Sequence, residues 1–101
     1  DQIVNVYPYT TKKQVSAQTS VLCNNIICIM DPSKQNIIAF DLRSKSFFFT
    51  VDNFLPFPPT NDSIFIGGNL HIFDGVTAAH AICNIESVET RENRPRLRMT
   101  D

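Results

Sequence analysis

The feature that most constrains the fold is a short pattern that occurs twice, 43 residues apart. Residues 63–75 read SIFIGGNLHIFDG, which is an apolar run, two glycines, a second apolar run and an acidic stop. Residues 20–32 read SVLCNNIICIMDP, with Asn24 and Asn25 in the places of Gly67 and Gly68. Two apolar runs joined by two glycines predict a β-hairpin, because glycine takes the positive φ values that tight hairpin turns need. The spacing therefore predicts two copies of one small β-structure.

The match extends beyond the hairpin and rests on residue class rather than on identity. The same shift lays Phe40-Asp41-Leu42 on Cys83-Asn84-Ile85. Short apolar runs between turn residues predict four strands in the first copy, at 20–23, 26–30, 37–42 and 47–51. The second copy has corresponding runs at 64–66, 70–73, 79–85 and 88–91. Residues 26–30 are apolar at every position, which predicts a strand that is buried on both faces.

A proline-rich stretch at 54–60, FLPFPPT, separates the two copies. Its prolines exclude a helix and favour an extended segment. One interpretation is a rigid connector between two sheets, and the other is a recognition motif for an aromatic groove. The apolar Phe54, Leu55 and Phe57 favour burial, and hence the connector.

Composition and charge exclude several classes of protein. Hydrophobic residues make up 43% of the 101 residues, which is enough for a core, so wholesale disorder is not expected. The net charge of −1 argues against a dedicated binder of nucleic acid or of anionic membranes. No run approaches the roughly 18 apolar residues of a membrane span, and no signal peptide is visible.

Three cysteines, Cys23, Cys28 and Cys83, all lie within apolar runs. The favoured interpretation is buried, reduced thiols in a cytoplasmic protein. A disulfide between Cys23 and Cys28, across the predicted turn, is the alternative. Zinc sites usually contain a closer pair of cysteines with further ligands nearby, so no zinc site is predicted.

Sheets that are apolar on both faces must pack between neighbours of the same kind. Radial stacking of such four-stranded sheets gives a β-propeller, whose repeats span about 40–50 residues. The chain would then be all-β and hold about two and a third blades, whereas closure needs roughly four to eight. The expected division is the last strand and crossing loop of a preceding blade at 1–19, one blade at 20–62 and another, possibly truncated, at 63–101.

Over most of its length the chain resembles kelch-repeat propellers. Asp31-Pro32 and Asp74-Gly75 stand near the glycine-doublet position of that family, and Phe47 follows Asp41 by six residues, as the family's tryptophan does. Residues 55–75 resemble the kelch crossing and hairpin, although the chain contains no tryptophan and neither doublet is intact. The alternative family is the WD40 propeller, whose third-strand ending resembles residues 38–44, without the preceding Gly-His pair. Both families share one blade topology.

The search for chemistry gives little. His71, Asp74 and His80 could form a metal site, but isolated strand histidines are more often core or edge residues. No nucleophile motif, phosphate loop or dinucleotide fingerprint occurs, so no catalytic residue, metal or other cofactor is predicted. Four arginines lie within 91–98 and could contact an acidic partner or phosphates. The glutamates nearby favour a solvated outer strand instead.

These observations predict a non-catalytic propeller module that binds proteins through its loops. The resemblance implies a scaffold, a substrate adaptor or a component of a cytoskeletal or axonemal assembly, completed by further blades or packed in a larger assembly. The candidate interaction residues are Asp31, Ser33, Lys34, Gln35, Asp74, Thr77, Arg94 and Arg96. Two alternatives stay open: a fragment of a propeller enzyme whose active site lies on other blades, and a small self-contained binding domain.

Overall fold

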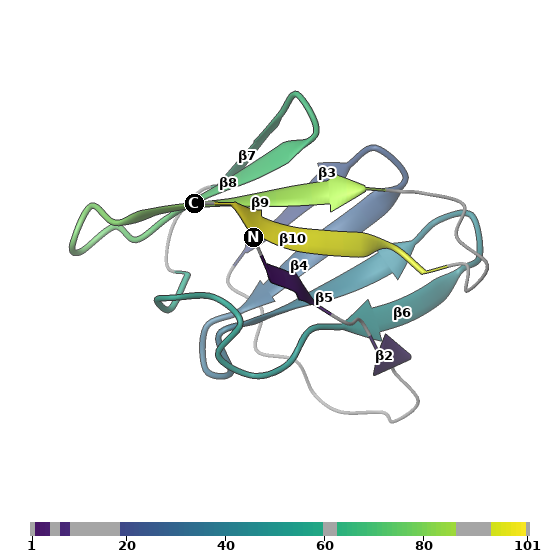
Figure 1. Cartoon of the computed structure of the whole chain (residues 1–101), viewed down its shortest axis with the longest axis horizontal. Coiled ribbons are helices and arrows are strands. Elements are labelled where there is room, and N and C mark those ends of the chain that lie inside the picture. Colours follow the sequence, from purple (N-terminus) through teal and green to yellow (C-terminus); the bar gives the residue numbers. More distant parts are fainter. Residues whose placement is uncertain (1, 5–6, 9–18, 60–62, 87–93, 101) are drawn as a thin grey trace.

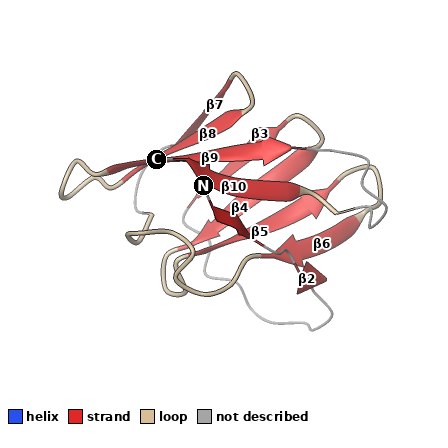
Figure 2. Cartoon of the chain, in the orientation of Figure 1, coloured by secondary structure: helices blue, strands red, loops and turns tan. Residues whose placement is uncertain are grey.

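The computed structural model describes residues 2–4, 7–8, 19–59, 63–86 and 94–100, and these form two antiparallel β-sheets (Figure 1). Within these ranges every regular element is a strand, as the colouring of Figure 2 makes plain. The prediction of an all-β chain built from antiparallel sheets is therefore confirmed.

Each sheet contains five strands, four of which come from one copy of the repeat or its continuation. The first sheet has the order β2 (Tyr7–Pro8), β6 (Ser46–Phe49), β5 (Asn36–Asp41), β4 (Ile26–Asp31) and β3 (Thr19–Cys23). The second sheet has the order β1 (Gln2–Val4), β10 (Arg96–Thr100), β9 (His80–Glu86), β8 (Asn69–Phe73) and β7 (Ser63–Ile66).

The register of the second sheet repeats that of the first across three strands. Ile27 lies opposite Phe40 in the first sheet, and 43 residues further on Leu70 lies opposite Cys83. The same correspondence holds between β3 and β4 and between β7 and β8. The 43-residue spacing is thus a repeat of backbone pairing, as the sequence predicted.

The hairpin turns also correspond. Gly67 and Gly68 have φ angles of 59° and 80°, and Asn24 reaches 56°. Glycine takes this conformation without steric cost, and asparagine tolerates it better than most residues. Each turn also accepts a backbone hydrogen bond from the residue at or just after the end of the third strand of its copy. The Ile85 amide donates to the Gly68 carbonyl at 3.0 Å, and the Leu42 amide donates to the Asn25 carbonyl at 2.8 Å.

The correspondence ends at the fourth strand. In the first sheet Ser46 lies opposite Asp41, so the repeat predicts Glu89 opposite Asn84. The structure instead places Arg98 there, in β10. The strand predicted at 88–91 lies outside the described residues.

The segment predicted to be the last strand of a preceding sheet is divided between the two sheets. β1 pairs with β10 at the edge of the second sheet, with Gln2 opposite Met99. β2 pairs with β6 at the edge of the first sheet, with Tyr7 opposite Phe49. Figure 1 shows β2 alongside β6, away from β10.

One hydrophobic core lies between the two sheets. Leu55 and Phe57 of the crossing segment are buried in it, which agrees with the predicted connector. The strands contribute Cys23, Ile26, Cys28, Met30, Ile37, Ala39, Phe48, Leu70, Ile72, Ala81, Cys83, Ile85 and Leu97.

The two sheets do not use equivalent faces to make this core. Met30 is fully buried on the first sheet, but its equivalent in the second sheet, Phe73, points away from the core and is 36% exposed. Ile72 is fully buried on the second sheet, and its equivalent, Ile29, lies on the far side of the first sheet, where it is half-buried. The sheets are therefore stacked in series, each presenting a different face to the common interface. Burial of β4 on both faces was predicted; one face is complete and the other is partial.

Candidate functional site

The turn between β4 and β5 is held by an aspartate. Asp31 Oδ1 accepts hydrogen bonds from the Ser33 amide at 3.0 Å and from the Ser33 hydroxyl at 2.7 Å. An aspartate that bonds the backbone two residues ahead forms an Asx-turn, which explains why this residue follows the strand. Both of these Asp31 side-chain bonds therefore lie within its own turn, and the residue is only 3% exposed.

The equivalent turn between β8 and β9 uses Asp74 in the same way. Asp74 Oδ1 accepts a bond from the Val76 amide at 3.1 Å, and Oδ2 accepts one from the Thr77 hydroxyl at 2.6 Å. The Asp74 amide donates to the Ala79 carbonyl, which closes the loop. Val76 is left at the tip with 86% of its surface exposed. The second turn thus presents an apolar side chain on a rigid backbone.

The crossing segment fastens the first turn from the side. The Asn53 amide donates to the Lys34 carbonyl and the Leu55 amide to the Gln35 carbonyl, both at 2.8 Å. The Gln35 side chain donates back to the Leu55 carbonyl at 3.0 Å. Leu55 is buried, so these bonds fix the turn to the hydrophobic core.

The candidate interaction residues fall into two groups. Residues 31–35 and 74–78 lie at the left of the molecule in Figure 1, where the crossing segment also runs. Arg94 and Arg96 precede or begin β10, which starts at the far end of β9, where Arg96 lies opposite Glu86. We call the first group, with residues 51–59, the turn end. The structure does not bring the two arginines to the turn end.

The face of the second sheet that points away from the core carries a group of polar side chains beside the exposed Ile64, Ile66 and Phe73. Sequence reasoning found this polar group only in part. His71 Nδ1 lies 3.0 Å from His80 Nε2, and Phe73 stacks on His80 with ring centroids 4.6 Å apart. Asp74, the third residue of the imagined metal site, is engaged in its turn. Among the described residues no three histidine, cysteine or acidic side chains are placed to hold one metal ion.

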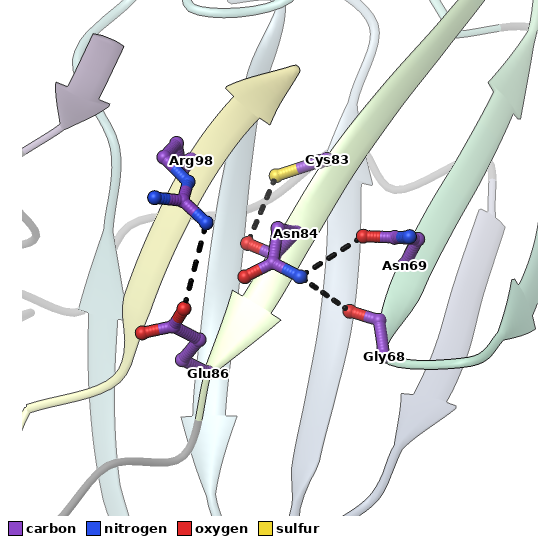
Figure 3. Close-up of polar contacts among 6 residues, drawn as sticks. All are labelled: Gly68, Asn69, Cys83, Asn84, Glu86 and Arg98. Carbon is purple, nitrogen blue, oxygen red and sulfur yellow. Dashed lines mark hydrogen bonds and ion pairs between the residues drawn. The ribbon is translucent and has the colours of Figure 1, made fainter. Parts of the chain in front are cut away.

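A second polar cluster lies further along the same face (Figure 3). The Asn84 amide donates to the Asn69 side chain at 3.0 Å and to the Gly68 carbonyl at 3.3 Å. Next to it, Arg98 and Glu86 form an ion pair at 3.6 Å. The Asn84 Oδ1 and Arg98 Nε atoms are buried and have no hydrogen-bond partner within the described ranges. The alternation of asparagine, histidine and arginine with apolar residues along these strands could have revealed this face.

The three cysteines are free and buried, as the sequence predicted. Burial raises the pKa of the Cys83 thiol to about 12. A hydrogen bond with Cys28 lowers the pKa of Cys23, and that same bond, together with burial, raises the pKa of Cys28. Thiols buried in this way pack as small apolar side chains rather than act as nucleophiles.

Comparison with protein-family models, with curated proteins and with solved structures found no match. Across the described segments, no helix has the length and apolar character needed to cross a membrane.

Proposed function

We propose that this chain is part of a β-propeller, kelch-like in its repeat, and that it binds other proteins without catalysing a reaction. The observation that supports the proposal best is the serial stacking of the two sheets. In a propeller every blade uses one face for the preceding blade and the opposite face for the next. At each interface, a residue that faces the neighbouring blade therefore has an equivalent in that blade that points away from the interface. A sandwich with two-fold symmetry would instead bring equivalent faces together. The WD40 propeller, with the same blade topology, is the alternative within this class.

The turn end is the proposed site of protein binding. Its backbone is fixed by the side chains of Asp31 and Asp74 and by the bonds between Gln35 and Leu55. A rigid loop loses little conformational entropy when it binds a partner. Val76, 86% exposed at the tip, supplies an apolar contact, and Lys34 supplies a cation. We place the protein in the cytoplasm, as a scaffold or adaptor or within a cytoskeletal assembly.

The test is proximity labelling in cells, with variants that leave the turn bonds intact. Lys34→Glu combined with Val76→Asp changes one partly exposed and one exposed side chain of the turn end. Lys45→Glu is the matched control, because it reverses an exposed charge in the turn at the opposite end of the first sheet. A protein that is labelled by the wild type and by the control, but lost with the double variant, supports the proposal. Equal labelling by all three proteins, or no reproducible partner, contradicts it.

A further inference from the structure

Two histidines of neighbouring strands meet on the outward side of the second sheet, and we call them the histidine pair. His71 lies in β8 and His80 begins β9, and His71 Nδ1 is 3.0 Å from His80 Nε2. They are the only histidines in the sequence. Among the described residues, neither ring makes a further hydrogen bond. A bond between groups that reach solvent adds little to stability, because water competes for it, so stability alone is a weak reason for this pairing.

The pairing of the strands and the stacking of the rings hold the histidine pair in place. Phe73 lies directly opposite His80 and stacks on it, with ring centroids 4.6 Å apart and ring planes 7° apart. The two imidazole rings also stack on each other, with centroids 5.2 Å apart. Stacking restricts the rotation of these rings, so the two nitrogens stand close together before any ligand arrives. Such preorganisation lowers the entropy cost of binding.

The immediate surroundings of the histidine pair are uncharged and reach solvent. Ile64 and Ile82 lie directly opposite His71, one on each neighbouring strand. With Phe73 opposite His80, every described side chain directly opposite the pair is apolar. His80 is exposed, and Ile64 is 50% exposed. A cation can therefore approach the two nitrogens from solvent without repulsion from a lysine or an arginine at these positions.

The separation of the two nitrogens suits a metal ion. Neutral imidazole is a common protein ligand of copper, nickel and zinc. With metal–nitrogen bonds of about 2.0–2.1 Å, two nitrogens 3.0 Å apart subtend an angle of about 95° at the ion. That angle is close to the right angle between neighbouring ligands in tetragonal copper and nickel sites, and it is narrower than the tetrahedral angle of zinc sites. We propose that His71 and His80 together bind one divalent transition-metal ion, and that Cu²⁺ and Ni²⁺ are preferred to Zn²⁺.

Each imidazole binds the ion through the nitrogen that faces its partner. His71 therefore binds through Nδ1 and keeps its proton on Nε2, whereas His80 binds through Nε2 and keeps its proton on Nδ1. Water completes the coordination on this chain, so the ion binds more weakly than at zinc sites with three or four protein ligands. His80 directly follows the turn that closes at Ala79, so a further sheet stacked on this face would meet the ion near its edge. The proposal does not depend on protein binding at the turn end.

The experiment is calorimetric titration of the untagged whole chain with NiCl₂, using two histidine variants and a matched control. His71→Gln and His80→Gln each remove one imidazole, and Ile66→Gln places the same side chain at a position of the same face that is 62% exposed. The expected result is one ion per chain for the wild type and for Ile66→Gln. Each histidine variant should bind about tenfold more weakly or worse, because the second ligand of a preformed pair acts at a high effective concentration. Mg²⁺ should not bind, since it prefers oxygen ligands.

Nitrogen-15 NMR of the wild type during titration with Zn²⁺ tests the same site without a substitution. The resonances of His71 Nδ1 and His80 Nε2 should shift, and the other nitrogen of each ring should keep its proton. Circular dichroism checks that each variant remains folded, and if a histidine variant unfolds, the NMR result decides. The proposal is overturned if the wild type binds no Ni²⁺ up to millimolar ion, if two chains share one ion, or if the histidine variants bind as tightly as the control. Coordination through the other nitrogen of either ring also contradicts it.

Discussion

The two sheets share a backbone plan and differ in what their outward sides present to solvent. Ile29 and Ile72 occupy equivalent positions, yet one lies on an outward face and the other is fully buried between the sheets. Met30 and Phe73 show the reverse relation. Pairing register therefore does not depend on which face is buried. Hairpin turns and strand alternation set the register, and the polarity of the side chains then determines which face is buried and which is exposed to solvent.

The strongest test of this comparison is a lysine at each of the two equivalent isoleucines. Ile72→Lys buries an unpaired charge at a position with no exposure, so we expect a loss of about 4 kcal/mol or more in the free energy of unfolding. Ile29→Lys reaches solvent from the far side of the first sheet, so we expect a loss below about 2 kcal/mol. Urea unfolding at low protein concentration measures both. Similar losses would mean that the two faces are not used differently.

A smaller effect is expected from the thiol that the second sheet contributes to the core. The pKa of Cys83 is about 12 in the folded chain, against 9.0 for an ordinary thiol. Between these pH values the folded state keeps a proton that the unfolded state releases. The contribution of Cys83 to the free energy of unfolding is therefore fully present below pH 9 and is lost as the pH rises. The expected slope is about 1.4 kcal/mol per pH unit, reaching about 4 kcal/mol near pH 12.

Urea unfolding of the wild type and of Cys83→Ala, measured at several pH values, isolates this contribution. The variant loses packing at every pH, but its stability should fall less steeply above pH 9 than that of the wild type. Equal slopes in the two proteins would show that Cys83 does not titrate with a raised pKa.

The smallest expected effect concerns the two hairpin turns. Gly67 has a φ of 59° and open space around the position that a Cβ would take. Gly67→Ala should therefore cost about 1 kcal/mol from backbone conformation alone. Gly67→Asn should cost less, because Asn24 holds the same conformation in the first copy. Thermal unfolding measures both variants, and an alanine variant as stable as the wild type would contradict this account.

The sequence predicted the regular parts of the fold and failed where the repeat is interrupted. The turns at Asn24 and Gly67 and the aspartate stops at Asp31 and Asp74 act locally, so pattern alone could place them. The place of Arg98 could not be read in this way, because the register of β10 depends on how many residues separate it from β9.

Side-chain roles were harder to predict than strands. Asp31 and Asp74 were predicted to be interaction residues, but their carboxylates accept hydrogen bonds within their own turns. The pairing of His71 with His80 depends on diagonal neighbours in two strands, which requires the register as well as the alternation. The first copy alone could not show which face of the first sheet packs against the second sheet, because both sides of β4 are apolar.

One consequence follows from the pairing of β1 with β10. Gln2 lies opposite Met99, so β10 and all of the chain between the two strands must be made before β1 can pair with β10. Contacts between such distant residues close large loops, which slows folding. We therefore expect the hairpins of both sheets to form early during synthesis, and the pairing of β1 with β10 to be among the last steps in the folding of these two sheets.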